Sequence, residues 1–436
     1  PGLGQGLARA WPGLGQGLAR ALSGLCQGLP LTNKVDTREL SIQQLEERKK
    51  ADLKRAEKRK KRGKKVFSKE ITLTTKITFV SMERKTPPVL SNLDPILTDE
   101  GFYGVKLAIE DNLTTGRFVG HDYKASFHRI SLNEKLNQEF EKLIDKGHKI
   151  FIVDLTEDEI LSLKKLRGFD QVLIFNIRSK SDSLRNEKCA KNIYHIPPSY
   201  SMLSDALTQY LVKKKWTKWF LVTGPDKSDK NYSNALKESA KKFNIKIKEE
   251  KVWDFTSDLR RTAGKEVPIF TKGSRYDVLV VADEKGEFGE YLAYRTWDPR
   301  PIAGSQGLKP NSWHRTHEQW GATQMQNRFR RESGRWMTEV DYHAWTAVRS
   351  LGEAITRTQK NSVTDIIKYL SGSSFGLGAY KGMKVSYRSW NGQMRQPILL
   401  AAPRSMVSVS PQDGYIHPFS ELDTLGKDKP ESTCKF

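Results

Sequence analysis

Tryptophan, arginine and histidine side chains gather between Arg295 and Arg330, around an expected strand and the loop that follows it. Guanidinium groups bind carboxylates through two hydrogen bonds and stack on rings, while indole rings offer flat apolar faces. This combination suits the binding of a flat anionic ligand better than it suits catalysis. We therefore predict ligand contacts from two groups of residues; the alternative is a surface loop whose aromatic rings pack locally. The groups are Arg295, Trp297 and Arg300, and Trp313, His314 and Arg315.

Further candidate ligand contacts follow expected strands, because open α/β sheets bind ligands beyond the carboxyl ends of their strands. Arg178 closes the run VLIFNIR, where it is either a ligand contact or part of a solvated turn. Tyr200, Glu284 and Gln306 occupy similar positions. Charged groups there can bind ligand or can serve as hinge and capping residues. If the ligand is a zwitterion, Asp283 or Glu284 is the expected partner of its amine.

Short β-branched runs alternate with amphipathic segments from Ile71 onward, which is typical of βαβ units and a parallel sheet. The expected strands cover 71–80, 123–129, 150–153, 172–176, 193–195, 218–223, 245–249, 277–282 and 301–304. After Gly307 the pattern predicts helices at about 315–333, 339–358 and 362–371, and then strands at 383–388, 397–402 and 406–410. Pro197 and Pro198 exclude helix from their loop, so the chain is expected to cross there into a second lobe.

This order predicts an α/β fold of two doubly wound parallel-sheet lobes joined by hinge crossings. Lobe one is expected to comprise 66–198 and about 308–372, and lobe two 199–307 and about 373–411. Residues 412–436 form a C-terminal tail. A ligand would bind in the cleft between the lobes, where closure excludes water and strengthens charged contacts.

The chain of 436 residues has a formal charge of +23, of which residues 1–65 carry +10 and the remainder +13. Such a surface attracts anionic small molecules, nucleic acid or anionic lipid without selecting among them. The block 48–65 contains twelve basic residues, two acidic residues and no aromatic residue. It is expected to be a disordered linker, although nucleic acid or an anionic membrane could also bind it.

Residues 1–29 repeat with a period of eleven and match no clear secretion signal. We interpret them as a low-complexity leader or an over-extended gene model, so that 1–65 form a disordered repeat and polybasic leader. The export signal is not evident in this sequence. No run of eighteen apolar residues occurs, so no membrane-spanning helix is expected.

Three cysteines are too few for a disulfide scaffold, and Cys26, Cys189 and Cys434 do not have the spacing of a zinc site. Cys189 precedes an expected strand, and Cys434 lies two residues from the C-terminus, in a segment that would fray without an attachment. We predict a Cys189–Cys434 disulfide formed in an oxidising compartment. The alternative is two unrelated free thiols.

Two local patterns look like enzyme motifs but lack the context that their chemistry requires. The segment 372–376 matches G-x-S-x-G, yet a nucleophile elbow needs a strand before the serine, and a helix is expected there. His314 and His317 are spaced like a metal-binding pair, but no third ligand is evident. We therefore predict no catalytic residue, no metal site and no catalytic cofactor.

Long segments of the chain resemble one family of transport proteins. These segments are DEGFYGVKLAIEDNLTTGRFVG, YDVLVVADEKGEFGEYLAYRTWDPRP, RTWDPRPIAGSQGLKPNSWHRTHEQWGATQMQNRFR and WNGQMRQPILL, with SVSPQDG and SELDTLG near the end. They resemble the periplasmic substrate-binding proteins of ABC transporters that are encoded with pyrroloquinoline quinone-dependent alcohol dehydrogenases. The resemblance covers roughly residues 70 to 434.

The resemblance implies a non-enzymatic periplasmic protein with the type I periplasmic binding protein fold. It implies pyrroloquinoline quinone or a related anion as the ligand, an ABC transporter permease as partner and a link to the alcohol dehydrogenase system. No specific nucleic-acid partner is expected. Two alternatives stay open: an amino-acid or organic-acid solute-binding or sensing protein, and a polybasic-tailed nucleic-acid-binding or scaffold protein.

Overall fold

The computed structural model of the protein describes residues 69–84, 96–255 and 262–436. The chain divides into one unit of residues 1–67 and one of residues 68–436. The predictions made for the leader at 1–65 and for Cys26 lie outside the described residues. All of the fold given below belongs to the second unit.

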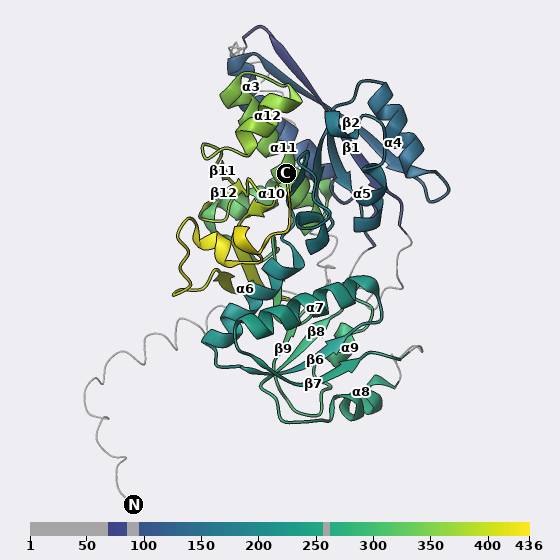
Figure 1. The fold of residues 1–436 in the computed structure, drawn as a ribbon, viewed down its shortest axis with the longest axis vertical. Coiled ribbons are helices and arrows are strands. Elements are labelled where there is room, and N and C mark those ends of the chain that lie inside the picture. The colour runs from purple at the N-terminus through teal and green to yellow at the C-terminus, as the bar shows by residue number, and fades with distance from the viewer. Residues whose placement is uncertain (1–68, 85–95, 256–261) are drawn as a thin grey trace, which may run out of the picture. The chain divides into compact units, whose positions relative to one another are not determined.

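Lobe one is built on a five-stranded parallel sheet (Figure 1). Its strands lie in the order β2-β1-β3-β4-β5. They are β1 (Leu73–Met82), β2 (His121–Ile130), β3 (Ile150–Asp154), β4 (Leu173–Asn176) and β5 (Ile193–His195). The helices of this lobe are α3 (Phe102–Val119), α4 (Leu136–Asp145), α5 (Glu157–Leu163), α10 (Ala322–Ser333), α11 (Glu339–Thr358) and α12 (Val363–Leu370). Strand side chains alternate between two apolar clusters, one with α3 and α11 and one with α4 and α5, so the sheet is covered on both faces.

Lobe two repeats this plan with a four-stranded parallel sheet in the order β7-β6-β8-β9. Its strands are β6 (Lys218–Thr223), β7 (Lys246–Val252), β8 (Val278–Ala282) and β9 (Ile302–Gly304). Its helices are α6 (Tyr200–Lys213), α7 (Lys227–Lys242), α8 (Ala263–Thr271) and α9 (Gly289–Leu292). One apolar cluster joins the sheet to α6 and α7, and another joins it to α8 and α9. The predicted α/β fold with two parallel-sheet lobes is confirmed.

Two small antiparallel sheets complete the second unit. One contains β10 (Lys309–Asn311), β14 (Ile398–Ala402) and β15 (Ser405–Ser410), and the other contains β11 (Leu377–Gly378), β12 (Lys384–Tyr387) and β13 (Met394–Arg395). The sequence pattern assigns 373–411 to lobe two, but Leu377, Tyr387 and Met394 pack in the core of lobe one. Figure 1 shows β11 and β12 beside α10 and α11. Lobe two therefore resumes after Arg395, where Ile398 of β14 packs with α6.

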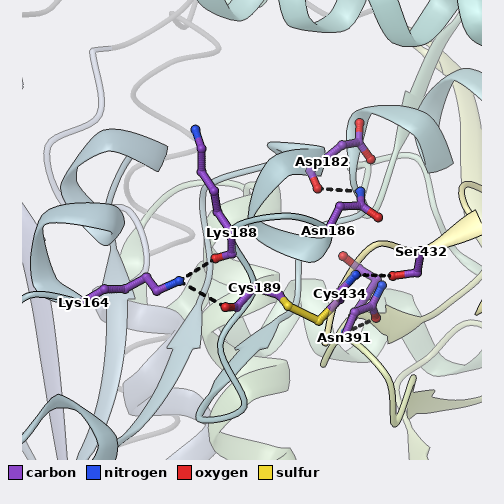
Figure 2. The surroundings of a disulfide bond; sticks show 9 residues. Lys164, Asp182, Asn186, Lys188, Cys189, Asn391, Ser432 and Cys434 are labelled. Atoms are coloured by element: carbon purple, nitrogen blue, oxygen red, sulfur yellow. Dashed lines mark hydrogen bonds between the residues drawn. A yellow bond between two sulfur atoms is a disulfide. The ribbon is translucent and has the colours of Figure 1, made fainter. Parts of the chain in front are cut away.

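The C-terminal tail packs against the body and does not extend into solvent. Leu425 is fully buried in the apolar cluster of α6 and α7. The predicted disulfide is present between Cys189 and Cys434, whose Cα atoms are 5.7 Å apart (Figure 2). Lys164 donates hydrogen bonds to the carbonyl oxygens of Lys188 and Cys189, which fixes the lobe-one side of the bridge.

Helices α3 and α11 approach each other closely because α3 has a glycine at the crossing. A Cβ atom on Gly104 would collide with the backbone carbonyl of Asp341 in α11. Gly104→Ala is therefore expected to lower the free energy of unfolding by about 1–3 kcal/mol, although alanine is the better helix former. Urea titration would measure this. Gly264→Ala in α8 is the matched control, because a Cβ there meets no atom within 4 Å; equal stability of the two variants would contradict the packing argument.

Candidate functional site

The carboxyl ends of the two parallel sheets meet at one ion pair. Lys180 follows β4 and Glu284 follows β8, and Nζ of Lys180 lies 3.1 Å from Oε2 of Glu284. The two side chains are 25% and 13% exposed. Burial disfavours the charged lysine, but the carboxylates of Glu284 and Glu339 raise its pKa. Because α/β sheets bind ligands at these edges, the region around this pair is the candidate site.

A second carboxylate faces Lys180 from the first residue of α11. Oε1 of Glu339 accepts hydrogen bonds from the backbone amide of Ser312 at 2.6 Å and from its Oγ at 2.7 Å. The same Oγ lies 2.6 Å from Nε2 of His343. Burial opposes ionisation, yet Lys180, His343 and Ser312 lower the pKa of Glu339 to about 2. Glu339 therefore presents a fixed negative charge at neutral pH.

The carboxylate of Glu339 makes the free energy of unfolding depend on pH in the acid range. Its folded pKa of about 2 lies below the ordinary value of 4.5, so the unfolded chain binds more protons between these values. Its contribution is complete above pH 4.5 and is lost as the pH falls toward 2. Glu339→Gln should lower the free energy of unfolding by about 1–3 kcal/mol at pH 7. Urea titrations at pH 7, 4 and 3 should show the gap to the parent closing with acid; a constant gap would assign the effect to packing.

Two buried tyrosines lie next to this charge cluster. Tyr200 begins α6, and its ring centroid is 5.7 Å from that of Tyr232 in α7. Burial and the negative charge of Glu284 raise the pKa of both phenols, so both are neutral donors. The hydroxyl of Tyr232 is buried and has no hydrogen-bond partner among the described residues. A buried polar group without a partner costs free energy, so this hydroxyl is a candidate ligand contact.

A cavity of about 280 Å³ opens beside Tyr200. Its walls come from α5 and the loop 181–188 of lobe one, from α7 of lobe two and from the C-terminal segment. The lining residues are Glu157, Ser181, Asp182, Ser183, Lys188, Tyr200, Lys227, Asn231, Asn234, Ala235, Glu238 and Lys427. Three lysines and three carboxylates are among them, so the cavity suits a polar, charged ligand better than an apolar one.

Arg178 lies at the carboxyl end of β4, as predicted, but carboxylates already occupy its guanidinium group. It binds the carboxylate of Asp154, and its Nη2 lies 2.8 Å from Oε2 of Glu100. Burial opposes the charge, but these two carboxylates raise its pKa above the ordinary value. A ligand carboxylate would have to displace them. Arg178 is therefore placed to order the edge of the sheet.

The structure separates Arg295, Trp297 and Arg300 from the cleft. These residues precede β9, which is parallel to β8, so they lie near the amino edge of the sheet, opposite to Glu284. All three are exposed, and the Trp297 ring packs under the ammonium group of Lys272 at 4.7 Å. Because α9 carries the chain back before β9 begins, the structure does not bring these three residues to the facing edges of the sheets.

The three residues of the second predicted group differ in burial. Trp313 is buried and stacks on Tyr342 with 4.5 Å between ring centroids, while its indole nitrogen has no hydrogen-bond partner in the described part of the chain. His314 is half-buried, and burial together with Arg315 lowers its pKa to about 4. Arg315 is exposed and donates to the carbonyl of Pro403.

Gln306 follows β9 at the carboxyl edge of lobe two, close to Gly289. The predicted residues that the structure brings to the facing edges are thus Arg178, Tyr200, Glu284 and Gln306.

Comparison with known proteins supports this arrangement of lobes and cleft. The sequence profile of a family described as periplasmic binding protein matches residues 133–263. A periplasmic binding protein from Burkholderia mallei is 16% identical with a TM-score of 0.61, over 83% of this chain and 98% of that one. No curated protein matches the chain. The chain has the periplasmic binding protein fold.

Two further structures with this fold belong to proteins that are named for different ligands. A branched chain amino acid ABC transporter periplasmic ligand-binding protein from Burkholderia xenovorans is 13% identical, with a TM-score of 0.61 over 77% of this chain and 95% of that one. An ABC transporter solute binding protein from R. palustris, in complex with benzoate, is 12% identical, with a TM-score of 0.60 over 83% and 99%. At such identities the fold is shared and the ligand is not determined.

The sequence patterns missed several groups that this binding-protein fold brings to the site. Lys180 follows Arg178 by two residues, and Glu339 begins a predicted helix, but no local pattern marks either as a site residue. Ser312 and Glu339 meet although 27 residues separate them. The capping box formed by Thr338 and Asp341 marks the helix start and could have directed attention to Glu339.

The enzyme-like patterns occupy ordinary structural positions. The segment 372–376 follows helix α12, so no strand precedes Ser374. His317 lies 2.7 Å from the carbonyl oxygen of Tyr380 through its Nε2. Across the described residues, no group of three or more His, Cys, Asp or Glu side chains has metal-binding geometry. None of the helices in that part of the chain is long and apolar enough to cross a membrane.

Proposed function

We propose that this chain is a non-catalytic, periplasmic solute-binding protein that captures a small charged molecule between its lobes for an ABC importer. The observation that carries the proposal is the Lys180–Glu284 contact, at which the carboxyl edges of both sheets meet. Proteins of the same fold named as ABC transporter solute-binding proteins support it. The Cys189–Cys434 disulfide fits an oxidising compartment.

A zwitterion such as an amino acid is the ligand that the geometry supports best. Glu284 and Glu339 offer carboxylates to an amine, while Lys180 stands between them as the cationic partner for a carboxylate. The buried hydroxyl of Tyr232 adds a neutral hydrogen bond. A site with both positive and negative side chains favours a ligand that carries both charges. Closure removes each charged group of the ligand from water, and an oppositely charged side chain then compensates for the lost hydration.

Pyrroloquinoline quinone, or a related anion, is the second candidate. Lys188, Lys227 and Lys427 line the cavity and could bind several carboxylates. Glu157 lies 3.5 Å from Lys188 and 3.8 Å from Lys227, so a polyanion would have to compete with it. The resemblance of long sequence segments also favours this ligand and would connect the protein with a quinone-dependent alcohol dehydrogenase system.

Thermal unfolding of the full chain with added ligands tests the two candidates. A ligand that binds only the folded state stabilises it by about 2.7 kcal/mol at a hundredfold excess over its Kd, so the unfolding temperature rises. A rise with amino acids supports the zwitterion, and a rise with pyrroloquinoline quinone, accompanied by a change in its visible spectrum, supports the second candidate. If amino acids, organic acids and the quinone all leave the temperature unchanged, the proposed ligand class is wrong.

Glu284→Gln distinguishes the candidates further. We expect it to weaken the binding of an amino acid by about 10–100-fold, because the amine loses a charge-assisted hydrogen bond. Binding of the quinone should stay the same or strengthen, because a negative charge is removed. Glu287→Gln is the control, since its side chain is 43% exposed and lies three residues further along. Calorimetric titration would measure both; equal losses in the two variants would exclude a direct role for Glu284.

A further inference from the structure

The C-terminal residues 421–434, here called the strap, contact both lobes. On the side of lobe two, Leu425 is buried against α6 and α7, and the backbone amide of Gly426 donates to Oδ2 of Asp205 at 2.9 Å. Lys242 of α7 binds the same carboxylate at 2.8 Å and the carbonyl of Gly426 at 3.3 Å. This end of the strap is therefore fixed to α6, the first helix after the crossing at 196–199.

On the side of lobe one, the strap binds the segment around β12 and β13. The carboxylate of Asp423 accepts hydrogen bonds from the guanidinium groups of Arg388 at 2.8 Å and Arg395 at 2.8 and 2.9 Å. Arg388 also donates to the carbonyl oxygens of Leu425 and Lys427. The neighbours of these arginines pack in the core of lobe one. These non-covalent contacts by themselves connect the strap to both lobes.

The disulfide adds a covalent connection next to the cavity. Cys189 directly follows the loop 181–188, which contributes four residues to the cavity wall, and Lys427 of the strap lines the same cavity. Figure 2 shows Cys434 reaching Cys189 beside this loop. Beyond Lys427, His417 lies 3.2 Å from Asp428, and the amide of Cys434 donates to Ser432 within the strap itself.

We propose that the Cys189–Cys434 bond makes the strap a redox-sensitive restraint on the wall of the interlobe cavity. While the bond is intact, Lys427 belongs to the closed covalent loop 189–434, and the segment 181–188 joins that loop at Cys189, so both parts of the wall are tied to the same bridge. A dithiol that transfers two electrons and two protons converts the bond into two thiols and is itself oxidised to a disulfide. Both cysteines are half-buried, so a small dithiol can reach them. This inference concerns the ligand-free chain and does not depend on which solute binds.

Hydrogen exchange of the full chain tests the restraint, with dithiothreitol as the dithiol. The background is Cys26→Ser, so that one disulfide at most can form, and the second variant is Cys26→Ser with Cys434→Ser. We expect both reduction and the Cys434 substitution to speed exchange of the amides of Asn186, Lys188 and Gly426 by about tenfold or more, because local opening no longer strains the bridge. The amide of Ile152 in β3 should keep its rate.

A second comparison separates restraint of the wall from simple attachment of the tail. Ser432→Ala removes the hydrogen bond to Cys434 and keeps the disulfide, so it should leave the amides of the loop 181–188 unchanged. Faster exchange limited to residues 428–436, with the loop and Gly426 unaffected by reduction or by Cys434→Ser, would overturn the proposal. It would show that the bond only pins the chain end.

Discussion

Asp423→Asn is expected to lower the free energy of unfolding by about 3–5 kcal/mol, among the largest effects of any single substitution in this protein. The Asp423 side chain is 1% exposed, and it neutralises Arg388, whose side chain is 2% exposed. Arg395 also depends on this carboxylate. Without it, the Arg388 guanidinium stays buried against carbonyl oxygens and the Trp390 ring, and removing a charge from water without a bound counter-ion is costly.

The control for this prediction is Asp413→Asn. Asp413 forms an ion pair of 2.9 Å with Lys213, but its side chain is 98% exposed, so the pair is screened by water. We expect a change below about 1 kcal/mol. Urea titration monitored by tryptophan fluorescence would measure both variants. If they lose similar amounts of stability, burial of the Asp423 pair is not what matters.

The parallel strands of this protein could be predicted from the sequence because they are buried on both faces. The runs 150–153 and Val278–Ala282 are apolar without interruption and short, which distinguishes them from helices. Helix α11 was equally clear, since its apolar positions recur over twenty residues after a capping box. Local signals and the tertiary fold agree in these elements.

Helix α3 was not predicted because its sequence serves packing more than helix propensity. Gly104 and Gly116 weaken an isolated helix, yet each lies where a Cβ atom would collide with the backbone of another element. The two-residue strands β11 and β13 were also beyond prediction, since so few residues carry no periodicity. Because these strands are not predicted, the sequence places the return to lobe two at about residue 373, before its position after Arg395 in the structure.

The candidate site could be predicted only where a residue directly follows a strand. Glu284 and Gln306 directly follow β8 and β9, and Tyr200 begins the helix after β5, so the direction of the parallel strands brings them to the facing edges of the two sheets. Arg295 and Trp297 are close to β9 in sequence but lie before it, so the same rule places them at the other edge. The contact of Glu339 with Ser312 required the return of the chain to lobe one, which no local pattern encodes.

Lys180→Met removes the ion pair between the lobes and should lower the free energy of unfolding by about 2–4 kcal/mol. Lys180 lies 3.1 Å from Glu284 and lowers the pKa of Glu339, so its loss leaves two partly buried carboxylates without their shared cation. Repulsion between them opposes closure, and we expect weaker binding of any ligand that closure encloses.

The matched control for this prediction is Lys285→Met in the adjacent loop. Lys285 forms a 2.7 Å ion pair with Asp226, but its side chain is 50% exposed, so we expect less than about 1 kcal/mol. The difference between the variants should narrow as the pH falls below about 4.5, because Glu339 without Lys180 is protonated at a higher pH than in the parent, which removes the repulsion. Chemical unfolding at pH 7 and pH 3 would measure this. If the free energy of unfolding of Lys180→Met falls as far below that of the control at pH 3 as at pH 7, the loss comes from packing of the lysine side chain. That result would contradict an electrostatic contact between the lobes.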